Sequence, residues 1–276
     1  AETLKSVLNQ TYCDYEVIVV NDSSTDNSLE VASSFQDERI HIYTKENEGV
    51  SAARNYGIMH AKYDYIAFLD ADDIWESDYL ECQKKLIGTY PDAGIYSTAF
   101  YSLEKGKRKL RNVLINEHIH FLVHDYFKES VMNGLSICWT SSLCLKKEVI
   151  KEIPMFRVGI KRGEDLDLWL RIALNYDVAY LNLPKVFYRT GLSDSLTSDY
   201  SKNGEFPYYE WFNFTSESSY YRKYVILVVY IHAKNAFIHH DYDTCLAELW
   251  SVKTIAWRFK WAERLLLLVI SWIKSK

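Results

Sequence analysis

The clearest indication of the fold comes from YIAFLDADDIWESDYLE, residues 65–81. It begins with an apolar run typical of a buried strand, and this run ends in three carboxylates, Asp70, Asp72 and Asp73. A helical pattern follows over residues 77–90. Like charges this close together repel one another and are costly to bury without partners. The cluster therefore requires a cation, a set of backbone donors or open water around it.

The first half of the chain repeats this alternation of short apolar runs and amphipathic helical patterns. Near-continuous apolar runs separated by such helices predict βαβ units, in which helices cover both faces of a parallel sheet. The predicted strands cover residues 15–22, 39–44, 65–70 and 91–103, and the predicted helices cover 2–9, 24–36, 49–61 and 77–90. The sequence therefore predicts an α/β fold with a mostly parallel central sheet flanked by helices.

The pattern changes after residue 103. The basic run EKGKRK, residues 104–109, predicts the turn of a hairpin-like insertion exposed to solvent. Extended segments are predicted at 137–147 and 177–189, and helices at 148–153 and 163–176. From about residue 205 the chain is more aromatic and helical.

Composition excludes several classes of protein. The 276 residues are 48% hydrophobic and 25% charged, which is ordinary for a globular chain. A formal net charge of −5 argues against nucleic acid as the main partner. The five cysteines form no CxxC pair, so we expect reduced thiols and a cytoplasmic location. The chain has no signal-peptide pattern at its start and no apolar run of the ~18 residues that span a bilayer.

Acidic residues follow two of the predicted strands. Asp22 follows the run YEVIVVN, and Asp70 and Asp72 follow YIAFL. Ligands of open α/β sheets bind beyond the carboxyl ends of the strands, so these side chains line one edge if the strands are neighbours. Carboxylates there suit a nucleotide and Mg²⁺ or Mn²⁺. In the alternative interpretation, Asp72 and Asp73 cap the next helix or lie in water.

Two further segments carry candidate site residues. In NEGVSAARNYG, Gly49 precedes a helix that contains Arg54, and a guanidinium suits a phosphate or a base edge, although a surface arginine is the simpler interpretation. The phosphate-binding patterns GxGxxG and GxxxxGK[ST] are absent, so a metal must replace a glycine-rich loop. In GEDLD, residues 163–167, acids in the first helical turn favour the helix dipole, and one can also accept a proton from an attacking hydroxyl.

Four motifs occur in order over about residues 1–190: QTYCDYEVIVVNDSSTDNS, NEGVSAARNYG, YIAFLDADD and GEDLDLWLRI. This set resembles family 2 glycosyltransferases of the GT-A fold, in particular the bacterial inverting enzymes that build cell-envelope polysaccharides and glycans. The resemblance implies a GT-A catalytic domain over residues 1–204 and a helical region over 205–276. It also implies that this domain is N-terminally incomplete, because the usual first strand is missing before Ala1.

The resemblance assigns a role to each matching position. The donor nucleotide-sugar and its metal are implied for Asp22 (the base), Asn47, Gly49 and Arg54 (the second donor segment), Asp70 (the ribose) and Asp72 (the metal, with Asp70). Asp165 is implied as the general base and Glu164 as its acceptor-side neighbour. Trp75 and Trp169 are either sugar-stacking platforms or core residues, with the core favoured for Trp169.

The implied function is a metal-dependent inverting glycosyltransferase. It uses Mn²⁺ or Mg²⁺ and a nucleotide-sugar, most simply a UDP-sugar, and its acceptor is a hydroxyl of a glycan or lipid-linked saccharide. The alternative function is that of a degenerate GT-A module, which binds a nucleotide-sugar or a partner without turnover. A nucleotidyltransferase would show a glycine-rich N-terminal loop with a basic residue, which this chain does not show.

The C-terminal stretch WRFKWAERLLLLVISWIKSK, residues 257–276, places tryptophans and basic residues around an apolar segment. Such a helix suits a membrane surface, where lipid-linked acceptors reside. The alternatives are docking on the catalytic domain or on a second subunit in a homodimer. The membrane interpretation predicts peripheral attachment at the inner face of the cytoplasmic membrane.

Overall fold

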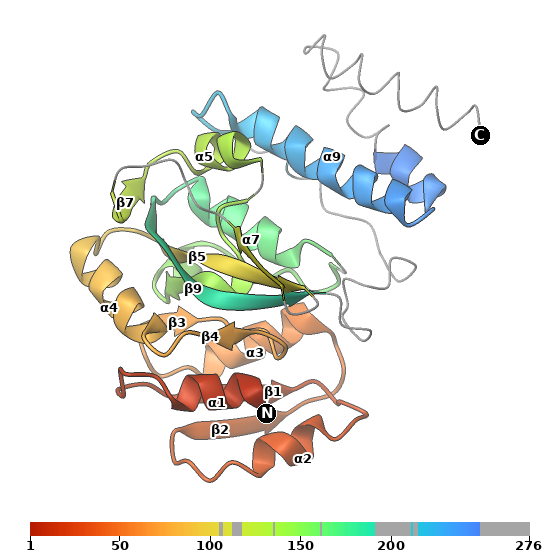
Figure 1. The fold of residues 1–276 in the computed structure, drawn as a ribbon. Coiled ribbons are helices and arrows are strands. Elements are labelled where there is room, and N and C mark those ends of the chain that lie inside the picture. Colours follow the sequence, from red (N-terminus) through yellow and green to blue (C-terminus); the bar gives the residue numbers. More distant parts are fainter. Residues whose placement is uncertain are drawn as a thin grey trace.

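The strands form two sheets in the computed structural model of the protein (Figure 1). The structure describes residues 1–104, 107–111, 118–134, 136–160, 162–190, 211 and 215–248. In the smaller sheet, β1 (Val17–Asn21) pairs in parallel with β2 (Ile40–Thr44). These strands lie at one end of the molecule beside α1 (Glu2–Leu8), α2 (Ser28–Ser33) and α3 (Val50–His60).

The larger sheet has the order β3-β8-β5-β9-β4, with β6 added to β5 and β7 added to β9. Its strands are β3 (Tyr65–Ala67), β4 (Ile74–Trp75), β5 (Ile95–Glu104), β6 (Lys107–Arg111), β7 (His120–Val123), β8 (Leu143–Lys146) and β9 (Val178–Thr190). The long central pair, β5 and β9, is parallel, with a register irregularity around Ala99.

The expected α/β fold with a central sheet flanked by helices is confirmed, but the strand pairing is more mixed than expected. β1–β2 and β5–β9 are parallel, whereas β3–β8, β4–β9, β5–β6, β5–β8 and β7–β9 are antiparallel. Of these antiparallel pairs only β5–β6 joins consecutive strands through a short connection. The strands of the other antiparallel pairs are far apart in the sequence, so tertiary packing brings them together. The hairpin between β5 and β6 is the insertion predicted from the basic run, but Glu104 and residues 107–109 of that run lie in the paired strands and not in the turn.

Helices cover both faces of the larger sheet. Along β9 successive side chains alternate between two hydrophobic clusters, as strand geometry requires. Val178 and Tyr180 face a cluster that includes α7 (Glu164–Ala173), α5 (Tyr126–Asn133) and α9 (Tyr221–Ile238). Ala179 and Leu181 face the cluster of α4 (Tyr79–Thr89). Helix α7 is the central element of the first cluster, because Leu168, Trp169, Leu170 and Ile172 are all fully buried.

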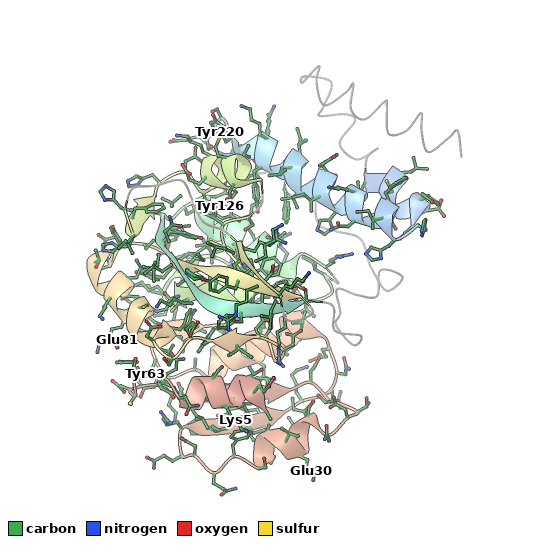
Figure 2. The ribbon with its side chains drawn as sticks, in the orientation of Figure 1. Lys5, Glu30, Tyr63, Glu81, Tyr126 and Tyr220 are labelled. Atoms are coloured by element: carbon green, nitrogen blue, oxygen red, sulfur yellow. The ribbon has the colours of Figure 1, made fainter. Side chains whose placement is uncertain are left out.

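Helix α9 confirms the expected helical C-terminal region. Buried tyrosines of α9 pack against α5. Figure 2 labels Tyr126, the first residue of α5, and its hydroxyl lies 2.9 Å from that of Tyr224 of α9. No helix in the described part of the chain is long and apolar enough to cross a membrane. The expected domain boundary at residues 204/205 and the tail at 257–276 lie outside the described residues.

One predicted strand is interrupted. Residues 137–147 suggested a continuous extended run, but only β8 is a strand, and Thr140–Ser142 form the 3₁₀ turn η1 before it. Short α6 (Val149–Glu152) follows as predicted. This interruption matters because the turn carries two side chains of the site.

Two glycines provide a test of the packing between β5 and α7. A Cβ added at Gly94 would lie 2.6 Å from Cβ of Tyr176, whereas one added at Gly88 in α4 meets nothing within 4 Å. We expect Gly94→Ala to lower the free energy of unfolding by roughly 1–3 kcal/mol, because the added methyl overpacks the junction. Gly88→Ala should raise it by up to about 1 kcal/mol through helix propensity. Urea unfolding of both variants checks this pair, and equal effects would contradict the packing described.

Candidate active site

The acidic loop, residues 70–73, connects β3 and β4 and is fixed by Asp73. The Asp73 side chain is fully buried, and its two oxygens accept hydrogen bonds from the Ser141 hydroxyl (2.5 Å) and the Arg189 N–H (3.0 Å). Ser141 Oγ in turn accepts from the Asp70 N–H at 3.1 Å. Burial raises the pKa of Asp73 to about 7, although the Ser141 hydrogen bond opposes this shift. The alternative interpretation, in which Asp73 caps the next helix or lies in water, is therefore wrong for Asp73, because its partners come from η1 and β9.

Arg189, near the end of β9, holds the same loop from the other side. Its guanidinium donates to the Asp72 carbonyl and, at 2.5 Å, to the carboxylate of Glu2. Asp72 itself is partly buried, and this burial together with the nearby Asp70 charge raises the pKa of its carboxyl. Among the described residues, no side chain donates a hydrogen bond to the Asp72 carboxylate, which leaves its oxygens available to a ligand.

Helix α1 braces the segment that follows the acidic loop. Thr3 donates to the Ala71 carbonyl at 2.7 Å, Ser6 accepts from the Trp75 N–H at 3.2 Å, and Gln10 bonds both the Glu76 carbonyl and the Leu80 N–H. Thr3 and Ser6 are three residues apart and share one face of the helix, and Gln10 lies two residues beyond its last residue, Leu8. The backbone from residue 71 to residue 80 is therefore held at several points.

Arg54 of α3 joins two distant carboxylates. Its guanidinium donates to Asp70 Oδ1 at 2.8 Å and to Glu164 Oε1 at 2.7 Å. The guanidinium carbon also lies 5.3 Å from the centroid of the Phe156 ring. The side-chain amide of Asn55 donates to the Phe156 carbonyl and accepts a hydrogen bond from the Phe156 N–H. Burial works against the charge, but the surrounding carboxylates outweigh it and raise the pKa of Arg54. A permanently charged group thus connects the acidic loop to the start of α7.

Glu164 and Asp165 begin helix α7. Gly163 precedes them with a φ of +73°, a conformation that favours glycine. Asp165 accepts from the Thr140 hydroxyl at 2.9 Å and from the Leu166 N–H at 2.7 Å. Burial and the neighbouring Asp165 charge raise the pKa of Glu164 to about 7, against the pull of Arg54.

Asp22, at the end of β1, organises the loop before α3. Its carboxylate accepts from the Lys45 ammonium (2.9 Å) and from the N–H groups of Glu48 (3.1 Å) and Gly49 (2.7 Å). Burial alone would raise the pKa of Asp22, but these donors outweigh it and lower the pKa. Gly49 caps α3 with a φ of +89°, and Asn47 is exposed on the same loop.

The structure therefore connects the predicted residues in two ways. Arg54 bridges the acidic loop to Glu164, and η1 bridges it to Asp165 through the neighbouring Thr140 and Ser141. Asp22 and Gly49 are joined to each other at the N-terminus of the helix that carries Arg54.

The sequence interpretation missed Asp73, Thr140 and Ser141 as site residues. The available signal was the polar triplet TSS, residues 140–142, inside an otherwise apolar run. Such short hydroxyl side chains can be buried only where they find hydrogen-bond partners.

The two tryptophans proposed as sugar platforms are core residues. Trp75 is buried, its indole N–H donates to the Ser141 carbonyl at 2.7 Å, and its ring stacks on Tyr79. Trp169 is fully buried against the rings of Phe68 and Phe156. The core position favoured for Trp169 is confirmed, and the platform alternative is wrong for both residues because neither ring is exposed to a ligand.

A metal at the acidic loop would need ligands from outside the protein. Within the described residues, no group of three or more His, Cys, Asp or Glu side chains is arranged to hold a metal ion. Asp70 and Asp72 supply two carboxylates, and Mg²⁺ is often held by one or two carboxylates together with substrate phosphates. The donor set therefore fits a hard divalent cation that binds with a phosphorylated ligand.

The sequence profile of glycosyl transferase family 2 matches residues 1–153, more than half of the chain and including the acidic loop and Arg54. The protein belongs to glycosyl transferase family 2.

Curated relatives share this family character. The chain is 31% identical over 182 residues to TuaG of Bacillus subtilis, named as a putative teichuronic acid biosynthesis glycosyltransferase, and covers 68% of that protein. It is 32% identical over 196 residues to the glycosyltransferase GlyA of Streptococcus pneumoniae serotype 4, with 67% of this chain and 28% of GlyA aligned. An uncharacterized glycosyltransferase of Rickettsia felis is 35% identical over 62% of this chain and 27% of its own length. The chain thus spans about a quarter of several relatives that it matches.

Solved structures show the same fold. S. aureus TarS 1–349 in complex with UDP-GlcNAc superimposes with a TM-score of 0.71 at 16% identity, covering 90% of this chain and 75% of TarS 1–349. The complex of TarS 1–349 with UDP gives a TM-score of 0.59 over 83% of this chain and 60% of the other. This likeness confirms the GT-A fold of the family 2 domain.

The raised pKa of Glu164 predicts how the free energy of unfolding depends on pH. Because its folded pKa of about 7 lies above the ordinary glutamate value of 4.5, the folded state retains a proton that the unfolded state loses. Stability therefore falls as pH rises through this window. We expect Glu164→Gln to make this decline shallower, by up to ~1.4 kcal/mol per pH unit. The stability of this variant still declines with pH, because Asp73 also has a raised pKa.

Urea unfolding at intervals between about pH 5 and pH 8 measures the slope. The exposed Glu148, which pairs with Lys146 at the surface, provides the matched control Glu148→Gln, whose slope should equal that of the wild type. Identical slopes in all three proteins would contradict the raised pKa of Glu164.

Proposed function

We propose that the protein is a metal-dependent inverting glycosyltransferase that uses a nucleotide-sugar donor. One observation carries the proposal: a carboxylate at the start of α7, Asp165, is joined through two consecutive hydroxyls to the acidic loop of Asp70 and Asp72. A group able to accept a proton and a pair of carboxylates suited to a metal-bound diphosphate therefore belong to one network. Membership of glycosyl transferase family 2 supports this reaction class.

The donor is proposed to be a UDP-sugar, with Asp22 at the base, Asn47, Gly49 and Arg54 in the second donor segment, and Asp70 near the ribose. The bound UDP and UDP-GlcNAc of the two TarS structures support this choice of nucleotide. A carboxylate offers about four lone-pair sites, and Asp22 uses three of them for Lys45 and two backbone N–H groups. Asp22 can therefore accept one more hydrogen bond, such as that of a uracil N–H, while it holds the loop before α3.

Mn²⁺ or Mg²⁺ is proposed at Asp72 with Asp70. A nucleoside diphosphate is anionic and would be repelled by these carboxylates, whereas Arg54 and Arg189 are already bonded to protein oxygens. A bound cation removes this repulsion and stabilises the charge that develops on the leaving diphosphate. The raised pKa of Asp72 supports this arrangement, because an opposing charge near its partly buried carboxyl would favour the ionised form.

Asp165 is proposed as the general base. It accepts the proton of the acceptor hydroxyl as that oxygen forms a bond to the anomeric carbon, and the bond from this carbon to the diphosphate oxygen breaks on the opposite face. One displacement inverts the configuration and requires no enzyme nucleophile. Thr140 and the Leu166 N–H hold the carboxylate through one hydrogen bond to each oxygen, which leaves lone pairs for the acceptor. Glu164, bonded to Arg54, is proposed to line the acceptor side.

The acceptor is proposed to be a saccharide or a lipid-linked saccharide of the cell envelope. The naming of TuaG as a putative teichuronic acid biosynthesis enzyme supports this class. Attachment to the inner face of the cytoplasmic membrane, or a homodimer, would depend on residues 257–276, which lie outside the described structure.

Replacement of the proposed base separates catalysis from binding. We expect Asp165→Asn to lower kcat for sugar transfer by roughly 10²–10⁴-fold, because the amide cannot accept the proton, while UDP binding is retained. Asp92→Asn, at an exposed carboxylate before β5, is the matched control and should behave like the wild type. Transfer and donor hydrolysis are measured across UDP-, GDP- and dTDP-sugars, and UDP binding by calorimetry. A wild-type chain that binds UDP but turns over none of these donors would support the binding module instead.

Metal removal tests the proposed cofactor. We expect EDTA to abolish turnover and added Mn²⁺ or Mg²⁺ to restore it, since the two carboxylates repel the diphosphate without a cation. Asp72→Asn should raise the Mn²⁺ concentration required for half-maximal rate by about tenfold or more, and Asp92→Asn should leave it unchanged. Full activity in EDTA would show that the diphosphate is held by the protein alone.

A further inference from the structure

The 3₁₀ turn η1 presents two consecutive hydroxyls to two different parts of the site. Thr140 Oγ1 donates to Asp165 Oδ2 at 2.9 Å, and Ser141 Oγ donates to Asp73 Oδ2 at 2.5 Å. Both residues are almost fully buried, with exposed fractions of 2% and 0%. Ser141 Oγ also accepts the N–H of Asp70, the first residue of the acidic loop.

The two hydroxyls bond carboxylates that are far away in the sequence, whereas a buried hydroxyl often bonds a carbonyl of its own turn. The neighbouring Ser142 hydroxyl donates to the Trp139 carbonyl within its own turn at 3.0 Å and lies 3.4 Å from the Ser97 hydroxyl, so neither of these partners is a carboxylate. Thr140 and Ser141 reach carboxylates 25 and 68 positions away in the sequence. A hydroxyl that needs only a partner can use a nearby carbonyl, as Ser142 does.

The turn itself is held firmly. The Ser142 N–H donates to the Trp139 carbonyl at 2.9 Å, and the Ser141 carbonyl accepts the indole N–H of buried Trp75 at 2.7 Å. Consecutive Cα atoms are ~3.8 Å apart, and a hydrogen bond holds each of the two hydroxyls in its orientation, so their separation is fixed. A rigid turn that bonds both sides fixes the distance between the structures to which it is bonded.

From these contacts we infer that Thr140 and Ser141 are positioning residues, which set the geometry between the base at Asp165 and the donor-binding loop at residues 70–73. This inference rests on the proposed function. Thr140 orients the Asp165 carboxylate, which takes the proton from the hydroxyl of the acceptor sugar. Ser141 orients the backbone of the acidic loop, which carries the proposed metal ligands Asp70 and Asp72. Because Arg54 bonds Asp70 and Glu164 independently, loss of one hydroxyl leaves the two halves of the site connected.

Loss of each hydroxyl should change a different kinetic constant, kcat for Thr140 and the donor KM for Ser141. Thr140→Val should lower kcat by roughly 10- to 100-fold, because misplacement of a catalytic group by about 1 Å has effects of this size. The KM for the donor should change by less than about twofold, and Thr140→Ser, which restores the hydroxyl, should recover most of kcat. Ser141→Ala should raise the donor KM and the Kd for UDP with Mn²⁺ by about tenfold.

Ser142→Ala provides the matched control, because Ser142 has the same burial in the same turn and bonds neither carboxylate. Its kcat, donor KM and Kd for UDP with Mn²⁺ should stay within about twofold of the wild type. Thermal melting of all four full-length variants shows that each is folded under the assay conditions. Calorimetry with UDP and Mn²⁺ provides a readout independent of turnover.

Several outcomes overturn the inference. With an active wild type, it fails if Thr140→Val and Ser142→Ala have equal kcat, if Thr140→Ser does not recover the rate, or if Ser141→Ala binds UDP and Mn²⁺ as tightly as Ser142→Ala. An inactive wild type that binds UDP overturns the proposed function and the role of Thr140 together. In that case the calorimetric comparison of Ser141→Ala with Ser142→Ala still decides the role of Ser141.

Discussion

A single buried guanidinium joins the two halves of the site. Arg54 lies between Asp70 and Glu164, which are 16 and 110 positions away in the sequence. A buried charge is costly unless it is paired and hydrogen-bonded, and loss of one partner of such a pair is strongly destabilising. The position of α3 relative to the acidic loop and α7 is therefore constrained by electrostatics as well as by apolar packing.

A second polar connection runs parallel to the first. Where Arg54 joins charges, η1 joins carboxylates through hydroxyls, and Asp73 lies at its centre between Ser141 and the backbone of Arg189. Fully satisfied buried polar networks favour one arrangement over its alternatives, because a half-satisfied network is expensive. The acidic loop therefore has one well-defined conformation although it is short and rich in like charges.

Periodicity predicted most elements of the fold, because helices and strands of this chain bury regular faces. It also located Asp22, Asp70 and Asp165, since each follows a strand or begins a helix with a clear pattern. It did not predict the buried state of Asp73 or the turn at Thr140 and Ser141. Both depend on partners far away in the sequence, which local spacing does not contain. The antiparallel pairings were missed for the same reason, because strand neighbours are set by tertiary packing.

The brace between α1 and the segment after the acidic loop has a consequence for binding. The amide hydrogens of Trp75 and Leu80 are bonded by the side chains of Ser6 and Gln10, so they are shielded from solvent exchange before any ligand arrives. A loop that is ordered in advance loses little conformational entropy when it engages its ligand. Most of the interaction energy with the proposed nucleotide-sugar donor is then available for affinity and selectivity.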